Sequence, residues 1–548
     1  MIDRDIHRAR ALLVEGNALL RSVAAAQLRD LGIGKVTQTG RAQEARLLLE
    51  REPFEIVICS RELEGSQESG QDLLEELRRE RLLPHSTVFM MVTSQVSYLQ
   101  VVEAAEASLD GFLVRPYNTA LLAERLGQAR QRKRELAPVL QALDEGQPEL
   151  ALVHAIRRFQ SQQPHWAYCG RLAAELLLRL DRPAQARQVF EKLALASGNA
   201  TWARLGGARS LIALGDNGAA RQLVQAVLDA AAGSADAHDL LGRLLVDQCD
   251  FDSALGEYRR AAELTPGCLL RAQHAGALAF YQGQAADALQ WLERAIAMGV
   301  QSRLFDALSL LLVAMLHHDL GEAARVAAQC EQLRRFRERF PQSLRLRRFE
   351  TAAAVLQALL RQQPTQAQEH LAELSATIGA DDFDLESANV VLATWARMPA
   401  AQAAGHEAAL ERIALRFCTS KALAEVLMAS ARRTDLACDV VRRCQARISA
   451  WTQQAMECAM RGDPRGAVRQ LLEAGRSTLN AKLLEMAAGI ARRHAGDDPE
   501  LQAGAAEAGA LLGRSCAAVN HIAGIQRSGR SPGGLQLRGA GAAEPEAA

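Results

Sequence analysis

The clearest structural signal near the start of this sequence is the stretch Phe54-Glu55-Ile56-Val57-Ile58-Cys59-Ser60, a nearly continuous apolar run that ends on a hydroxyl. A short run of this kind is typical of a strand buried on both faces of a parallel sheet. Similar runs lie on either side of it, at residues 11–14, 35–39, 87–92 and 111–114.

Amphipathic segments at helical spacing follow these runs, over residues 18–31, 42–50, 71–79, 99–107 and 119–131. Strands that alternate with helices build a parallel sheet with helices on both of its faces. The sequence therefore predicts an α/β doubly wound five-stranded parallel sheet over residues 1–131. In such a fold a functional site lies at the carboxyl ends of the strands.

From residue 132 the strand signal stops, and a pattern with a step of 34 residues begins. A small residue lets two antiparallel helices approach closely, and a bulky residue fills the space between consecutive hairpins. We therefore predict an all-α superhelix of helical hairpins with turns at Asp181, Gly215, Cys249 and Gly283. The positions in step are Ala186, Ala220, Ala254 and Ala288; Ala174, Ala208, Gly242 and Gly276; and Phe190, Val224, Tyr258 and Leu292.

The repeats differ in clarity along the chain. We place them over residues 132–302, with a clear register from 167. Residues 303–525 stay helical in composition but form degenerate repeats, apart from one clear repeat near 448–481. Residues 526–548 begin with a Gly-rich stretch, which predicts a disordered tail.

Composition excludes several classes of function. Lys and Arg number 64, as do Asp and Glu, so the chain is formally neutral and is no general polyanion binder. The ten cysteines are scattered without a Cys-x-x-Cys motif, which favours a reduced intracellular protein. No apolar run approaches the roughly 20 residues of a membrane span. We expect a cytoplasmic, non-enzymatic protein with no membrane contact, metal or cofactor.

Two known families resemble these two regions. The strand ends resemble the receiver domain of two-component response regulators: Leu12-Leu13-Val14-Glu15-Gly16-Asn17, Phe54 to Ser60, Met91-Val92-Thr93-Ser94, and Asp110-Gly111-Phe112-Leu113-Val114-Arg115-Pro116-Tyr117. The repeat pattern resembles the tetratricopeptide repeat, most strongly over 167–302. That resemblance implies a superhelix whose concave face, lined by the first helix of each hairpin, binds protein segments.

The receiver resemblance implies a pocket formed by Glu15, Gly16, Ser60, Thr93 and Arg115, here called the receiver pocket. Receivers accept a phosphoryl group on an Asp where this chain has Ser60. They hold Mg²⁺ with an acidic pair where it has Glu15 and Gly16, and use a Lys where it has Arg115. Thr93 keeps the switch hydroxyl. One carboxylate is a poor Mg²⁺ site, and a serine hydroxyl is a poor acceptor without help. We predict a pseudo-receiver without a phosphoacceptor, in which Arg115 pairs with Glu15.

Two surfaces are expected to bind proteins. Phe112 and the last receiver helix would form a docking face for another two-component protein or for a second copy of the chain. The repeat resemblance implies a partner groove rich in the aromatic and Arg residues favoured at binding hot spots. Some of these residues could instead pack between helices. They are Tyr168, Arg171, Arg179, Trp202, Arg209, Asp239, Arg243 and Tyr281.

These features favour a non-catalytic signalling adaptor in a bacterial two-component, or phosphorelay, pathway. One alternative is a nucleic-acid-associated regulator that uses the segment from Arg334 to Arg348, where arginines alternate with Phe336, Phe340 and Phe349. The four-residue spacing of Phe336 and Phe340 instead favours one apolar face of a helix. Another alternative is a phosphorelay receiver with a nonstandard acceptor.

Overall fold

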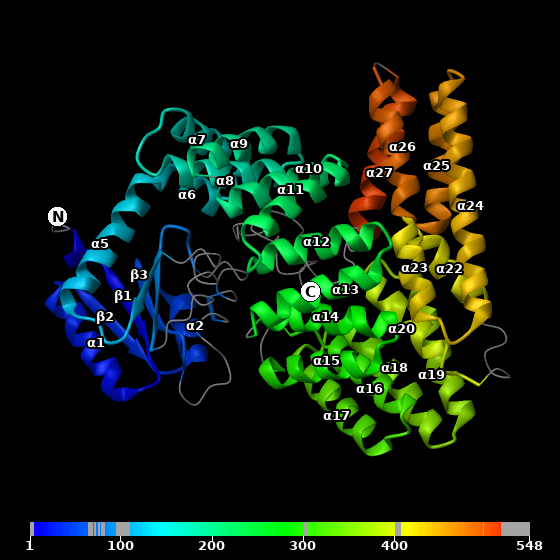
Figure 1. The fold of residues 1–548 in the computed structure, drawn as a ribbon, viewed down its shortest axis with the longest axis horizontal. Coiled ribbons are helices and arrows are strands. Elements are labelled where there is room, and N and C mark those ends of the chain that lie inside the picture. The colour runs from blue at the N-terminus through cyan, green and yellow to red at the C-terminus, as the bar shows by residue number, and fades with distance from the viewer. Residues whose placement is uncertain are drawn as a thin grey trace.

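In the computed structural model, the chain forms an α/β domain followed by a long, curved array of helices (Figure 1). The structure describes residues 5–63, 70, 73–74, 77, 83–94, 110–198, 200–266, 268–300, 305–399, 407–496 and 498–516. The helix expected at 99–107 and the tail expected at 526–548 lie outside these residues, as does most of 71–79.

The N-terminal domain contains a parallel five-stranded sheet with the order β2-β1-β3-β4-β5. The strand order reverses at β1, which pairs with both β2 and β3, so the sheet is doubly wound as predicted. The strands are β1 (Arg10–Val14), β2 (Lys35–Thr39), β3 (Ile56–Ser60), β4 (Val88–Thr93) and β5 (Gly111–Val114).

Both faces of this sheet are covered, which explains why β3 is apolar along its whole length. Ile58 belongs to a core cluster with Leu28 of α1 (Ala18–Asp30) and Leu126 of α5 (Thr119–Glu135). Val57 points the other way and shares a second cluster with Ala45 of α2 (Ala42–Arg51). The parallel strands β1, β3, β4 and β5, packed between these two cores, bring their carboxyl ends to the same edge of the sheet.

The helical array begins directly after α5, because Leu136 caps both α5 and α6. Consecutive helices pair into antiparallel hairpins that stack side by side (Figure 1). The helices of this part are α6 (Ala137–Asp144), α7 (Pro148–Gln160), α8 (Trp166–Arg179), α9 (Pro183–Ala196), α10 (Thr201–Ala213), α11 (Asn217–Ala230), α12 (Ala235–Asp247), α13 (Phe251–Leu264), α14 (Leu269–Gln282) and α15 (Ala285–Gly299).

The predicted repeat geometry is visible in the turns and in the helix contacts. Asp181, Gly215, Cys249 and Gly283 all have left-handed backbone angles, with φ of 54°, 82°, 64° and 79°. A Cβ at Gly242 would lie 2.9 Å from the buried ring of its hairpin partner Tyr258. The small and bulky series therefore meet as expected, and the close contact fixes the angle of each hairpin.

The C-terminal helices fold back onto the repeats. Every residue of α20 is buried, and α23 contacts both α12 and α14. The middle of the superhelix is therefore packed with the chain's own helices. The helices are α16 (Leu308–Asp319), α17 (Ala323–Arg339), α18 (Leu344–Leu360), α19 (Pro364–Ala376), α20 (Leu385–Trp395), α22 (Glu407–Phe417), α23 (Lys421–Ser430), α24 (Asp435–Met460), α25 (Pro464–Thr478), α26 (Ala481–His494) and α27 (Pro499–Leu511).

The predicted late repeat near 448–481 falls on the hairpin of α24 and α25, whose turn contains Gly462 with φ of 89°. Among the described residues, no helix is both long enough and apolar enough to cross a membrane.

Candidate functional site

The receiver pocket lies at the carboxyl ends of the strands, where Glu15, Ser60 and Arg115 meet. Arg115 Nη2 forms an ion pair with Glu15 Oε2 and lies 3.5 Å from Ser60 Oγ. The second carboxylate oxygen of Glu15 accepts a hydrogen bond from the backbone N–H of Asn17 at 2.9 Å. Glu15 and Ser60 are both buried. The chain itself therefore engages both oxygens of the one carboxylate that this pocket retains.

A second guanidinium approaches the same loop from α1. Arg21 Nη1 donates to the carbonyl oxygens of Glu15 and Gly16, at 2.6 Å and 3.2 Å. These are oxygens that a hard cation could otherwise use. Gly16 thus supplies no carboxylate, and its carbonyl is already bound to the positive charge of Arg21. Both features disfavour metal binding there.

Thr93 has a carboxylate partner that the sequence reasoning missed. Its buried hydroxyl donates to Glu62 Oε1 at 3.2 Å, and the hydroxyl of Ser94 donates to Glu62 Oε2 at 3.3 Å. Glu62 comes two residues after the end of β3, at the edge of the sheet where the pocket lies. In the sequence, only the position of Glu62 close behind this strand could have indicated that it binds the Thr93 hydroxyl.

The remaining pocket neighbours are apolar or only partly accessible. Phe112 is half-buried and packs against the core on the α2 face. Burial, reinforced by the charge of Glu15, raises the pKa of the Cys59 thiol, which makes this thiol a poor nucleophile. Burial also raises the pKa of Tyr117, although Arg115 opposes the shift. In the described part of the chain, no three His, Cys, Asp or Glu side chains gather to hold a metal.

The concave side of the repeats, here called the inner face, contains buried ion pairs between successive hairpins. Arg209 of α10 donates through Nη1 to Glu175 Oε2 of α8 at 3.0 Å, and through Nη2 to the other oxygen. Arg271 of α14 binds Asp239 at 2.7 Å and Asp236 at 2.6 Å, both on α12. These pairs join helices about one repeat apart and fix their relative positions.

Two residues expected to contact a partner are therefore inaccessible. Arg209 and Asp239 are each only 8% exposed, because each is paired with a charged residue of a neighbouring repeat. Their charges serve the packing of the superhelix, which was the alternative considered for this set of residues. Both residues therefore pack between repeats instead of lining an open groove as predicted.

Tyr281 is half-buried and packs against the core that the repeats share with the chain's own C-terminal helices. Its carbonyl accepts a hydrogen bond from Arg432 Nη1, just after α23, at 3.2 Å. Burial raises the pKa of the Tyr281 hydroxyl strongly. Nearby, Arg397 donates to both oxygens of Asp319 at 2.9 Å and 2.6 Å. The inner face beside α14 is thus occupied from within the molecule.

The accessible part of the inner face lies over α8, α10 and the end of α12. The guanidinium of Arg171 stacks 4.8 Å from the centroid of the Trp202 indole. Arg132, from the last receiver helix, lies 5.7 Å from the ring of Tyr168, so this face begins next to the receiver domain. The expected groove residues that keep some exposure there are Tyr168, Arg171, Arg179, Trp202 and Arg243.

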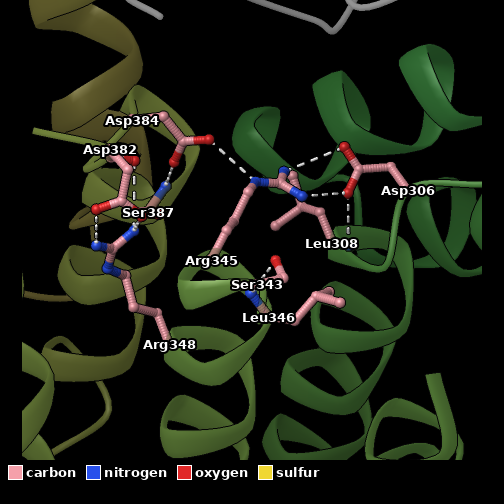
Figure 2. A network of polar contacts seen from close by, with 9 residues as sticks. All are labelled: Asp306, Leu308, Ser343, Arg345, Leu346, Arg348, Asp382, Asp384 and Ser387. Atoms are coloured by element: carbon pink, nitrogen blue, oxygen red, sulfur yellow. Dashed lines mark hydrogen bonds and ion pairs between the residues drawn. The ribbon is translucent and has the colours of Figure 1, made fainter. Parts of the chain in front are cut away.

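The basic segment from Arg334 to Arg348 makes internal ion pairs. Figure 2 shows Arg345 between two carboxylates, bound to Asp306 at 2.8 Å and to Asp384 at 3.0 Å. Arg348, one turn further along α18, binds Asp382 through two bonds of 2.7 Å and 2.9 Å. These contacts connect α18 to the segments before α16 and α20.

Four further arginines of this segment are matched in the same way, and Arg339 stacks on the rings of Phe336 and Phe340. Arg334 and Arg335 bind Glu331, Arg337 binds Glu350, and Arg347 binds Glu373. Phe336 and Phe349 are in the core, whereas Phe340 is partly exposed. The alternation of Arg and Phe therefore reflects amphipathic helices with internal charge pairing, which disfavours a surface that follows a nucleic-acid backbone.

Comparison with known proteins agrees with this architecture. The response regulator receiver domain matches residues 11–127, and the tetratricopeptide repeat matches residues 177–244. Chemotaxis protein CheY-3 of Vibrio cholerae serotype O1 is 30% identical over 123 residues, which span 22% of this chain and 92% of that protein. Chemotaxis protein CheY of Pseudomonas aeruginosa is 28% identical over 123 residues, which span 22% of this chain and 97% of that protein.

A solved structure, the C-terminal part of a TPR repeat-containing protein from Cytophaga hutchinsonii, aligns with 49% of this chain and 98% of its own, at 15% identity and a TM-score of 0.30. Through its N-terminal domain, the chain belongs to the response regulator receiver family, and tetratricopeptide repeats follow that domain. It is thus a two-component signalling protein with protein-interaction repeats. Domains of these two families are generally non-enzymatic.

Proposed function

We propose that this protein is a non-catalytic adaptor in a bacterial two-component pathway. The receiver domain would dock a signalling partner without accepting a phosphoryl group, and the repeats would hold a second protein. The observation that carries the proposal is the ion pair between Arg115 and Glu15, with Ser60 beside it. A Mg²⁺ ion would have to displace a guanidinium from a buried carboxylate, with no acceptor Asp to compensate.

The rigid start of the repeats supports a role in bringing partners together. Asp144 of α6 accepts hydrogen bonds from the backbone N–H of His85 in the receiver domain, at 2.8 Å and 3.1 Å. Lys133 of α5 donates to the carbonyl of the same residue at 2.5 Å. Two bound proteins would therefore be held at a fixed separation, and tethering raises the effective concentration of one near the other.

The receiver half of the proposal is tested by Mg²⁺-dependent binding of beryllofluoride to the full chain. We expect no saturable binding to the natural sequence. The variant Ser60→Asp/Gly16→Asp/Arg115→Lys restores the acceptor, the acidic pair and the lysine, and its binding shows that the assay works. Saturable, Mg²⁺-dependent binding to the natural chain would instead establish a working receiver with a nonstandard acceptor.

The repeat half is tested by affinity capture from the host lysate, with and without nuclease. We expect a nuclease-resistant protein partner that is lost with Trp202→Ala and kept with Arg187→Gln. Arg187 is a suitable control because, among the described residues, it pairs with its helix neighbour Glu191, and it is exposed on α9. If the captured partners disappear with nuclease and are unaffected by Trp202→Ala, the adaptor function is overturned.

A further inference from the structure

Two large apolar side chains are exposed near the end of the array, on the long helix α24. Met456 is 49% exposed and Met460 is 76% exposed. They lie one turn apart in the second half of this helix, so both project from the same side of it. An exposed pair is too small to identify a contact surface by itself, so its surroundings decide what it can do.

The repeat pattern places both methionines on the concave side of the last two hairpins. They stand one and five positions after Ala455, the buried small residue of the late repeat. On α8 the same two positions after Ala174 belong to Glu175 and Arg179, at the inner face. Equivalent helices of neighbouring hairpins lie side by side, and α24 contacts α26 (Figure 1). The methionines therefore border the concave surface of α26.

The exposed side of α26 continues this surface. Its small buried residue is Ala488, and Gly489 and Arg493 stand one and five positions after it, both exposed. A Cβ at Gly489 would meet nothing within 4 Å, so another backbone can approach the helix closely there. The C-terminal face, as we call this surface, comprises Met456, Met460, Lys482, Glu485, Gly489 and Arg493, with Arg492 at its edge.

The C-terminal face has an excess of positive charge that its own residues do not neutralise. Lys482 and Glu485 are one turn apart, so their charges offset each other. Among the residues that the structure describes, Arg493 makes no ion pair, and Arg492 donates only to the carbonyl of Ala488, at 3.2 Å. Both arginines also suit the partial negative charge at the end of α26, which requires no specific N–H contact. Their donors are therefore available to an acidic ligand.

We infer that the C-terminal face binds an acidic amphipathic helix of a partner protein, whose apolar side chains pack on the two methionines while its carboxylates bind Arg492 and Arg493. The methionines are one turn apart, which matches the spacing of apolar residues at i and i+4 on a helix. Flexible thioether side chains adapt to the shape of such a partner. This surface is a further partner site of the proposed adaptor, separate from the inner face of α8 and α10.

A protein helix fits this face better than a nucleic acid does. Glu485 is exposed on the same face and would repel a phosphate backbone. The exposed methionines also offer a base no aromatic ring on which to stack. A helix can place its acidic residues beside Arg493 and neutral residues beside Glu485. The partner helix thus carries its acidic residues toward one end of its apolar stripe.

The test is fluorescence anisotropy with the full chain and dye-labelled, alanine-based helical peptides. One peptide carries leucines at i and i+4 and two glutamates in the turn that follows. A second peptide has Gln in place of Glu, and a third has its leucines moved to opposite sides of the helix. At low salt we expect the first peptide to bind about tenfold more tightly than either of the others. An oligothymidylate of similar length tests for nucleic acid.

Two double variants separate the apolar contribution from the charged one. Met456→Ser/Met460→Ser should abolish binding of the first peptide, because it removes the apolar contact. Arg492→Gln/Arg493→Gln should remove the advantage of the Glu peptide over the Gln peptide. All four side chains are exposed, so the thermal unfolding midpoint of each variant should stay at the natural value.

The matched controls are Leu195→Ser and Arg187→Gln on α9, where Leu195 is 81% exposed and Arg187 is also exposed. Neither should change the binding of any peptide. Equal binding of the three peptides, no binding at all, binding that survives the methionine change, or tighter binding of the oligothymidylate would overturn the inference. Loss of peptide binding with Trp202→Ala alone would place the peptide on the inner face of α8 and α10. That result overturns the C-terminal site and leaves the proposed function standing.

Discussion

Arg115 and Glu15 form an ion pair across the carboxyl ends of β5 and β1, although 100 residues separate them in the chain. They meet because the parallel strands of a doubly wound sheet all end at one edge. The Glu15 side chain is only 4% exposed. A carboxylate buried this deeply needs a cation close by, so the pair explains how the receiver fold tolerates Glu15 without a metal.

Removal of Arg115 alone should therefore destabilise the receiver domain. We expect Arg115→Met to lower the free energy of opening of β1 and β3 by about 3 kcal/mol, because it leaves Glu15 buried without its cation. Amide hydrogen exchange of the full chain measures this locally, with the repeats as an internal reference.

The double variant Glu15→Leu/Arg115→Met is the control, because it removes both charges. Its exchange protection should return close to the natural level, since replacing a whole buried pair by apolar residues is often neutral or stabilising. If the double variant is as unstable as the single one, the loss comes from packing and not from charge.

The second prediction concerns the ion pairs in Figure 2, where Arg345 connects Asp306 and Asp384. Arg345→Met should lower the stability of the region around α16 to α20 by about 3 kcal/mol, because two partly buried carboxylates lose one shared cation. The change is measured as a shift of the thermal unfolding transition and as faster exchange in α18 and α20.

Arg347 gives a matched comparison on the same helix. It pairs with Glu373, but its side chain is 65% exposed. Arg347→Met should therefore cost less than about 1 kcal/mol. Similar losses in the two variants would mean that burial of the Arg345 network contributes nothing to its strength.

The folds of both regions could be predicted because their signals are local or regularly repeated. The apolar run that ends at Ser60 indicated a strand covered on both faces, and both faces are indeed covered. The recurrence of small and bulky residues indicated hairpins, because the close contact of Gly242 with Tyr258 depends on side-chain size alone.

The contents of the inner face could not be predicted in the same way. Arg432 reaches the carbonyl of Tyr281 across 151 residues, and no periodicity indicates that α23 folds back there. Likewise, the inward positions of Arg209 and Asp239 follow from helix geometry, but their burial depends on charges one repeat away. The role of Glu62 depends on a loop whose course the sequence does not specify.

The third prediction is a pH dependence within the repeats. Burial of His238 opposes its protonation, but hydrogen bonds to Glu257 and to the carbonyl of Ala232 raise its pKa above the ordinary 6.5 overall. The folded state thus favours the protonated ring. Its stabilisation is complete below pH 6.5 and is lost as the pH rises through the raised pKa.

We therefore expect the natural chain to lose thermal stability as the pH rises above 6.5, and His238→Gln to lose less over the same interval. His154, which is partly exposed on α7, provides the comparison through His154→Gln. If His238→Gln and the natural chain change in parallel with pH, this histidine does not contribute to the dependence.

The fourth prediction tests the contact between the small and bulky residues of a repeat. A Cβ added at Gly242 of α12 would lie 2.9 Å from the ring of Tyr258, which is fully buried and cannot move aside. Overpacking costs about 1–3 kcal/mol, whereas the change from Gly to Ala in a helix gains up to about 1 kcal/mol. We expect Gly242→Ala to lower the unfolding midpoint and to speed exchange in α12 and α13.

Gly256 lies on α13 of the same hairpin and has open space where a Cβ would stand. Gly256→Ala should therefore show only the gain in helix propensity, up to about 1 kcal/mol of added stability. Opposite signs for the two variants would establish that close helix contact, and not helix propensity, requires glycine at position 242. If Gly242→Ala instead raised the unfolding midpoint, α12 and α13 could move apart at no cost in stability. Side-chain size alone would then not determine the geometry of the hairpin.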